Sequence, residues 1–384
     1  MGFTLDDAFI ETQNEYKLKL LAGANGCGNA ISWVHMIEDT TMIQQFWGKE
    51  LAVTTGLGFQ DHDSLLHFIQ LLIKHHSVGV IINVGRYIHE IPQDIIDYCD
   101  EQDFPLLTMP WEVHMADLIR DFSIRCLSAE KEDKQISKYF KDVFTNAKLL
   151  DESKNKLVEA FDVEGSFQIV LISLEGDDEL SFIERKRIAS QLEICFEKIR
   201  SPYSFFWYDQ HFVLVVNNLP EEDLENIVYA MYRRAKKRIA EYPIHIGMSD
   251  SVRDFSNVIK VYKRAYAALR MAVQFQYETV FFREMGIYQL LFLIEDQAVL
   301  KNMHDELLQP LIQYDQQHHG ELENTLYEFL LNDGNQLAMS KKLFMHRNTI
   351  NYRMTKIKEL LCCDLNTFEE RLPYMLAFYE KKMF

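Results

Sequence analysis

The sequence predicts three consecutive folded parts: an α/β domain, a ferredoxin-like α+β domain and an all-α domain. In residues 1–127, short apolar runs typical of strands alternate with helical patterns. Residues 166–285 show the order strand-helix-strand-strand-helix-strand of the split βαβ arrangement. Residues 286–384 show helical patterns and no strand pattern. A chain of 384 residues has room for about two to four domains.

The first part alternates strands and helices along its length. Apolar runs predict strands at 31–37, 51–55, 78–83 and 106–109. Apolar residues at helical spacing predict helices at 61–76, 92–102 and 113–127. Strands separated by helices are typical of a largely parallel sheet covered by helices. We therefore expect residues 1–127 to form an α/β domain.

A charged segment, residues 128–165, joins the first part to the second. Ile136, Phe140, Phe144 and Leu157 stand there roughly at helical spacing. We expect one or two connecting helices. A dimer contact and a solvated linker helix inside a monomer fit this pattern equally well.

The second part, residues 166–285, contains four predicted strands and three predicted helices. The strands are expected at 167–174, 203–208, 211–216 and 244–248, and the helices at 181–200, 221–240 and 255–273. Asp209-Gln210 is the only connection between the second and third strands, which indicates a tight hairpin. This order predicts the ferredoxin-like fold.

The overall composition argues against a generally basic nucleic-acid binder. The chain has 40 Lys and Arg residues against 58 Asp and Glu residues, a formal net charge of −18. Its six cysteines form no C-x-x-C pair. Its start shows no signal-peptide pattern, and its apolar runs are far shorter than the roughly 18 residues of a membrane span. We expect a reduced, cytoplasmic protein with no membrane contact.

One window reverses the sign of the charge. Residues 334–358 contain six basic residues and no acidic one. Residues 335–343 read as a short helix, a break follows at 344–346, and a second helix is expected from Arg347 to about Leu361. Two helices joined by a tight turn form a helix-turn-helix, which we place at 335–361 within the helical domain 286–384.

The second of these helices has two distinct faces. Ile350, Met354, Ile357 and Leu361 form an apolar stripe. The other face carries amide and hydroxyl side chains suited to base edges in a major groove, namely Asn348, Asn351, Tyr352 and Thr355. The basic residues are expected to contact phosphates, and they are Lys341, Lys342, Arg347, Arg353, Lys356 and Lys358. The alternative is an exposed basic amphipathic helix without a partner.

The sequence resembles the PucR-type bacterial transcription regulators. His346-Arg347-Asn348-Thr349, followed by Tyr352-Arg353, closely resembles the signature of their carboxy-terminal helix-turn-helix; the one departure is Ser340, where the family usually has Ala. Trp33-Val34-His35 and Gly48 to Gly56 resemble their sensor domain, and residues 246–249 and 266–269 resemble their degenerate GGDEF-like domain. The three resemblances follow the family's domain order and cover nearly the whole chain.

The resemblance implies a DNA-binding transcriptional regulator that responds to a small metabolite of nitrogen or carbon catabolism, such as a purine or ureide product or an amino acid. It also implies that residues 1–127 sense the effector and that the protein works as a homodimer or higher oligomer on a double-stranded operator. For a dimer, two half-sites would lie about 34 Å apart.

Candidate effector residues lie where predicted strands end, because ligands of α/β sheets bind at the carboxyl ends of strands. Hydroxyls and backbone N–H groups there can hold a small anion, and a nearby arginine can engage a carboxylate or phosphate. The candidates, which include the Glu of the Gly-x-Glu-Leu stretch, are Glu50, Thr54, Thr55, Gly56, Asn83 and Arg86. Ordinary strand-end loops are the alternative for each.

The middle domain lacks the features that nucleotide cyclisation needs. A diguanylate cyclase requires carboxylates for two metal ions and a Gly-Gly turn against the phosphates. The hairpin Tyr208-Asp209-Gln210-His211 has no glycine, and the strand 167–174 has no acid. We predict no catalytic residue, no metal and no cofactor. A divergent nucleotide cyclase, or a nucleotide-binding signalling protein whose helical tail contacts protein rather than DNA, remains the alternative.

Overall fold

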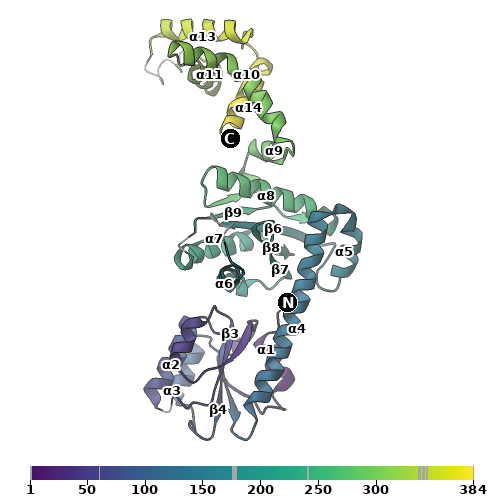
Figure 1. Cartoon of the computed structure of the whole chain (residues 1–384), viewed down its shortest axis with the longest axis vertical. Coiled ribbons are helices and arrows are strands. Elements are labelled where there is room, and N and C mark those ends of the chain that lie inside the picture. The colour runs from purple at the N-terminus through teal and green to yellow at the C-terminus, as the bar shows by residue number, and fades with distance from the viewer. Residues whose placement is uncertain are drawn as a thin grey trace. The chain divides into compact units, whose positions relative to one another are not determined.

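The computed structural model contains two compact units, residues 1–265 and residues 266–384 (Figure 1). It describes residues 2–59, 61–174, 180–239, 242–335, 339, 342 and 345–383. The first unit holds two sheets with their helices, and the second is mainly helical. This pattern confirms the predicted fold class. The domain bounds set from the sequence remain predictions.

A five-stranded sheet organises residues 1–127. Its order is β1-β5-β4-β3-β2. The strands are β1 (Lys19–Ala22), β2 (Trp33–Met36), β3 (Glu50–Thr54), β4 (Gly79–Val84) and β5 (Leu106–Pro110). Strands β2 to β5 pair in parallel, as predicted, and β1 runs antiparallel to β5 at the edge. The edge strand β1 was not predicted.

Helices cover both faces of this sheet (Figure 1). On one face lie α2 (His62–Lys74) and α3 (Gln93–Glu101), and on the other lie α1 (Leu5–Thr12) and the first part of α4 (Met115–Thr145). Neighbouring residues of β4 therefore enter different cores: Val80 and Ile82 pack with α2, and Ile81 packs with α1 and α4. A strand buried on both faces is expected to be apolar throughout.

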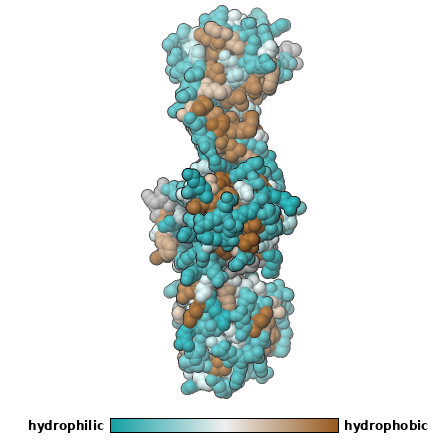
Figure 2. All heavy atoms as spheres, turned by 90° about the vertical axis from the view of Figure 1, so that its right-hand side faces the viewer, coloured by the Kyte–Doolittle hydropathy of each residue, from teal (hydrophilic) through white to brown (hydrophobic). Residues whose placement is uncertain are grey.

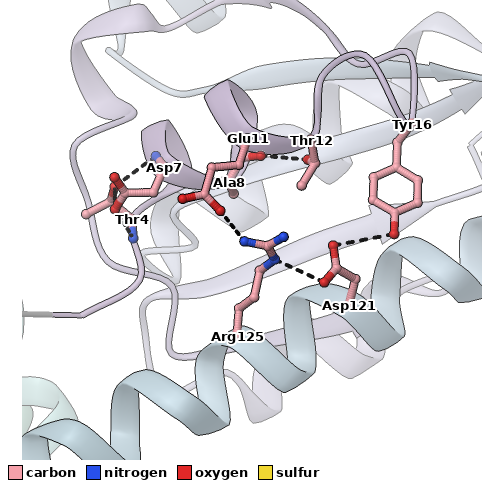
Figure 3. Close-up of polar contacts among 8 residues, drawn as sticks. All are labelled: Thr4, Asp7, Ala8, Glu11, Thr12, Tyr16, Asp121 and Arg125. Atoms are coloured by element: carbon pink, nitrogen blue, oxygen red, sulfur yellow. Dashed lines mark hydrogen bonds and ion pairs between the residues drawn. The ribbon is translucent and has the colours of Figure 1, made fainter.

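Polar contacts join α1 to α4 (Figure 3). Arg125 of α4 forms an ion pair with Glu11 of α1, and its Nε donates to Asp121 at 3.0 Å. The hydroxyl of Tyr16 donates to the same Asp121 at 3.4 Å. Thr4 caps the start of α1. These contacts hold α1, which the sequence reading missed, against α4.

The helix α4 continues well past the boundary predicted at residue 127. It has 31 residues, because no glycine or proline interrupts residues 115–145. Its second half packs on the middle domain, where Phe140 is buried and the Phe144 ring stacks on Tyr262 at 4.4 Å. After α4 comes α5 (Leu150–Leu157). The predicted connecting helices are thus α5 and the end of α4.

The middle domain has the predicted ferredoxin-like order. Its strands are β6 (Ser166–Leu174), β7 (Tyr203–Tyr208), β8 (His211–Asn217), β9 (Ile244–Met248) and the short β10 (Val252–Arg253). They pair antiparallel in the order β9-β6-β8-β7, with β10 beside β6. The helices are α6 (Phe182–Glu193), α7 (Glu221–Arg238) and α8 (Val258–Gln274). Figure 1 shows them packed around the sheet.

The carboxy-terminal unit packs its helices around two apolar clusters. After β11 (Thr279–Phe281) come α9 (Tyr288–Leu293), α10 (Gln297–His318), α11 (Leu322–Leu331), α13 (Arg347–Leu361) and α14 (Phe368–Lys381). The long α10 contacts α11, α13 and α14. The predicted first helix of the helix-turn-helix, 335–343, lies mostly outside the described residues, and so do Ser340 and Lys341.

Some apolar side chains of this unit lie on its surface. Figure 2 shows them gathered at the level of α9. Leu290 of α9 is 65% exposed and Val299 of α10 is 58% exposed, with Ile287 and Leu293 also exposed. An apolar patch of this kind often marks a contact with another molecule. Over the described part of the chain, no helix is both long and apolar enough to span a bilayer.

Candidate nucleic-acid interface and ligand site

The bounds of α13 are those expected from its apolar stripe. Ile350, Met354 and Ile357 are fully buried in the core of the carboxy-terminal unit, so the rotation of the helix about its axis is fixed. His346 caps the start, where its Nδ1 accepts from the backbone N–H of Asn348 at 3.3 Å. Cys362, in the left-handed conformation, ends the helix.

The four predicted base-contacting side chains all lie on the exposed face of α13. Asn348, Asn351, Tyr352 and Thr355 are exposed, and Tyr352 is 67% exposed. Burial of Ile350 and Met354 turns these polar groups outward as one row. The helix therefore presents amide and hydroxyl groups to whatever approaches this face.

The two arginines of α13 differ in their surroundings. Arg347 is exposed and makes no ion pair or hydrogen bond with any described residue. Arg353 reaches back to α11, where its Nη1 donates to Glu321 at 3.0 Å and to the Thr325 hydroxyl at 3.2 Å. Only 21% of the Arg353 side chain is exposed. Its guanidinium is therefore used inside the domain, which the sequence did not reveal.

The lysines predicted to contact phosphates already have weak partners at the surface. Lys342 pairs with Glu328 at 2.8 Å, and Lys356 pairs with Glu359 at 3.1 Å, which raises the pKa of Lys356. Lys358 donates to Asn366 at 3.4 Å. The Glu328 side chain is only 15% exposed, whereas Glu359 is 59% exposed, and exposed pairs contribute little and exchange readily. Lys341 lies outside the described residues.

In the sensor domain the predicted ligand residues divide between two edges of the sheet. Thr54 ends β3 and Asn83 lies near the end of β4, so these residues share the carboxyl edge of the parallel strands. The loops that follow also touch, because Gly56, at φ +80°, packs against Ile88. Glu50 begins β3 at the opposite edge. Its buried carboxylate accepts from the N–H groups of Trp47 and Gly48 at 2.7 and 2.8 Å.

The loop after β3 already holds a carboxylate of the chain itself. Glu38 accepts from the N–H of Thr55 at 2.7 Å, the N–H of Leu57 at 3.1 Å and the Thr54 hydroxyl at 3.2 Å. The Gly56 N–H donates to the Thr54 hydroxyl at 3.0 Å. The donors proposed for a bound anion are thus used internally, and an anion there would have to displace Glu38.

Arg86 is the candidate with a free approach from solvent. It is exposed, and its guanidinium carbon lies 5.4 Å from the Tyr87 ring and 5.5 Å from the Trp111 ring. Asn83, by contrast, is buried and donates to the Pro110 carbonyl at 3.0 Å. The sequence reading missed Trp111, although an aromatic residue directly after β5 is a signal that could have found it. The edge therefore offers the Arg86 cation beside two aromatic rings, whose centroids lie 5.8 Å apart.

The hairpin of the middle domain is a tight two-residue turn. Asp209 and Gln210 both have positive φ, +48° and +62°, as a type I′ turn requires. Asp209 is thus a turn residue. The buried strand β6 carries no acidic side chain.

Comparison with known families assigns each part of the chain. Residues 10–124 match the Purine catabolism regulatory protein-like family, residues 160–271 a GGDEF-like domain, and residues 322–379 the PucR C-terminal helix-turn-helix domain. The three matches follow one another in the order expected from the sequence. The chain belongs to the PucR-type regulators.

Several PucR-type relatives come from Bacillus subtilis. The DNA-binding transcriptional activator AdeR is 26% identical over 55% of this chain and 50% of its own length. The Purine catabolism regulatory protein is 27% identical over 33% of this chain and 24% of its own length. The Proline-responsive transcriptional activator PutR is 24% identical over 76% of this chain and 70% of its own length. The match thus spans about half the length of the first of these relatives.

The PucR-type helix-turn-helix match contains one of the two oxygen acceptors of Arg353, and the other, Glu321, lies just before it. It begins at Leu322 and includes Thr325, which binds Arg353. At the start of α11, the N–H groups of Leu322 and Glu323 donate to the Asp315 carboxylate at 2.8 and 2.9 Å. Asp315 thus fixes the turn between α10 and α11. No sequence signal pointed to this pairing.

Proposed function

We propose that this protein is a DNA-binding transcriptional regulator that reads its operator with α13. The observation that carries the proposal is the exposed row Asn348, Asn351, Tyr352 and Thr355 on a helix whose opposite face is locked into the core. Amide side chains can pair bidentately with adenine in the major groove. The names of its PucR-type relatives, which include transcriptional activators, support the same function.

In this proposal the basic side chains around α13 contact the DNA phosphates. Arg347 is the leading contact because it is exposed at the start of the helix, where helix-turn-helix proteins approach the DNA. Lys342, Lys356 and Lys358 can leave their surface partners for phosphate, and Lys341 belongs to the same group. Arg353 instead positions α13 through Glu321 and Thr325.

We infer a homodimer on DNA. A single α13 offers few contacts, and an otherwise acidic chain repels DNA, so paired helices are needed for useful affinity. Paired helices would read half-sites about 34 Å apart. The exposed apolar patch around Leu290 and Val299 supports a contact between copies.

We infer that the effector binds at the carboxyl edge of the sensor sheet, beside Arg86, Tyr87 and Trp111. A guanidinium suits a carboxylate, and the two rings suit a flat or aliphatic body. The class expected is a small carboxylate of nitrogen or carbon catabolism. Relatives named for purine catabolism and for a response to proline agree with this class.

The middle domain has no catalytic role in this proposal. Its hairpin is a plain tight turn and β6 carries no carboxylate that could hold a metal. Incubating the full chain with GTP or ATP and Mg²⁺ and finding no cyclic product is the expected result. Turnover would favour a divergent nucleotide cyclase instead.

The experiment that tests the function is DNA binding by the full chain. Fluorescence anisotropy with the DNA upstream of its own gene should show binding that weakens steeply with salt, because phosphate contacts release counterions. An unrelated fragment of equal length should bind more weakly. Equal, salt-insensitive signals from both fragments would favour a helical tail that contacts protein.

A further inference from the structure

The end of α7 in the middle domain is unusually basic. Five of its last six residues are cationic in a chain whose net charge is −18: Arg233, Arg234, Lys236, Lys237 and Arg238. The helix dipole favours cations only within the last turn, which holds Lys236, Lys237 and Arg238. The dipole therefore does not account for Arg233 and Arg234.

Four of these side chains line an open hollow at the surface. Its volume is about 450 Å³, and the side chains that line it are Arg233, Arg234, Lys237 and Arg238. This size lies within the roughly 300–1,000 Å³ of small-molecule sites. The lining residues stand at i, i+1, i+4 and i+5, so they form two neighbouring rows on one helix face. Among the residues that the structure describes, the lining of this hollow is entirely cationic, which suits an anion.

The cations repel one another as they stand. Arg233, Lys237 and Arg238 are exposed, and none has an ion pair or hydrogen bond with any residue that the structure describes. Like charges four residues apart on a helix are destabilising. A bound anion would remove this repulsion, so binding should stabilise the end of α7.

Arg234 is held in place in part by Gln191. Its Nε donates to the main-chain oxygen of Gln191 and its Nη2 to the Gln191 side-chain oxygen, both at 3.1 Å. The Gln191 amide in turn donates to the Trp47 carbonyl of the sensor domain at 2.6 Å. The hollow thus lies one side chain away from a contact between the two domains of the first unit.

The positive charges of α7 also affect two histidines of the sensor domain, His75 and His76. Burial, together with the charges of Arg234 and Arg238, lowers the pKa of His76 to about 4. The pKa of His75 is lowered too, by burial and by the charges of Lys74 and Arg238.

We propose that the hollow formed by Arg233, Arg234, Lys237 and Arg238 binds a small polyanion that carries at least two phosphate or carboxylate groups. Guanidinium groups bind such oxyanions through paired hydrogen bonds, and a monoanion would neutralise only one of the four charges. This site is separate from α13 and from the sensor edge, so it stands whether or not the protein binds DNA.

Calorimetric titration of the full chain at constant ionic strength tests the site. The probes are pyrophosphate, tripolyphosphate and citrate, which separate phosphate from carboxylate ligands. The double variant Arg233→Gln with Lys237→Gln should weaken binding by at least about tenfold, as loss of a charged hydrogen bond does. The control Lys236→Gln removes the same kind of charge from the same turn, outside the hollow, and should leave affinity nearly unchanged.

Three results would overturn the proposal. One is the absence of binding by all three probes in the millimolar range. Another is equal weakening by the control, which would indicate a diffuse charge effect. The last is a double variant that loses DNA affinity but keeps its anion affinity, which would make these cations a DNA contact. If the double variant does not fold, the single variant Arg238→Gln serves in its place.

Discussion

Arg353 of α13 donates to Glu321, at the start of α11, across a distance of 3.0 Å. This pairing separates the two arginines of α13 by role. Arg353 holds the helix to the domain, while Arg347, six residues earlier, faces solvent. A motif that looks uniformly basic in sequence thus combines a positioning group with a phosphate-binding group.

The first prediction contrasts these arginines. Arg347→Gln should lower affinity for every DNA fragment and reduce the slope of log affinity against log salt by about one per protomer, because one phosphate contact is lost. Arg353→Gln should leave that slope unchanged and lower the free energy of unfolding by about 1 kcal/mol, since Glu321 is largely exposed. Equal salt slopes for the two variants would contradict the division of roles.

The second prediction concerns sequence preference. Asn351→Ala should relax selection at one base pair of each half-site by about 1–3 kcal/mol, the worth of a bidentate amide–adenine pair. Selection of bound fragments from a random pool measures this change. The control is Asn302→Ala, which removes an exposed amide from α10 and should leave the preferred sequence unchanged.

The helix α13 shows what the sequence could predict. Its bounds follow from an apolar stripe and a flanking turn, both local features, and the structure places the helix at Arg347–Leu361. The pairing of Arg353 with Glu321 joins residues 32 positions apart. No feature of the neighbouring sequence indicates such a contact, so it could be found only in the folded structure.

In the sensor domain, too, local features were predicted and contacts between distant residues were not. The parallel strands were predicted because strands buried on both faces are continuously apolar. The edge strand β1 was missed because it is short and partly exposed. Glu38 was not predicted to hold the loop after β3, since it is 17 residues away from Thr55 and approaches only when β2 pairs with β3. Hence Thr54, Thr55 and Gly56 looked free in sequence.

The third prediction concerns Glu38. Glu38→Gln places an amide where two backbone N–H groups need an acceptor, so the free energy of unfolding should fall by about 1–3 kcal/mol. Chemical denaturation of the full chain, followed by a signal from the sensor domain, measures this loss. The matched change Glu90→Gln, at an exposed position in the same domain, should have little effect. Unchanged stability of Glu38→Gln would mean that the loop does not depend on this carboxylate.

The fourth prediction concerns the effector site. Arg86→Gln and Trp111→Ala should each weaken effector binding by about tenfold or more, because the cation and one of its aromatic walls are lost. Thermal-shift screening with amino acids, dicarboxylates and purine breakdown products first finds the ligand. Arg120→Gln, which removes an exposed cation of the same domain, should keep full affinity. A ligand that binds equally to all three variants would place the site elsewhere.

The fifth prediction is a pH dependence set by Glu380 of α14. The residue is 1% exposed, and neither carboxylate oxygen has a hydrogen-bond partner among the described residues. Its pKa is raised from 4.5 to about 7, mainly by burial; the charge of His304 lowers this pKa and the charge of Asp305 raises it.

Because this pKa is raised, the folded state keeps a proton that the unfolded state releases. The free energy of unfolding should therefore fall as pH rises from about 4.5 to about 7, by up to roughly 3 kcal/mol, and then level off. Denaturation at several pH values measures this, and Glu380→Gln should flatten the profile. An identical slope in the variant would assign the dependence to other groups.

Photo-crosslinking tests most directly whether α13 lies against DNA. Benzoylphenylalanine is placed at Tyr352 or, as a control, at Phe368 of α14, which is also 67% exposed. Each full-length protein is irradiated with the DNA upstream of its gene. The account predicts a covalent protein–DNA product from position 352 that disappears at high salt, and none from position 368. Crosslinking from 368 alone, or from neither position while the DNA remains bound, would contradict it.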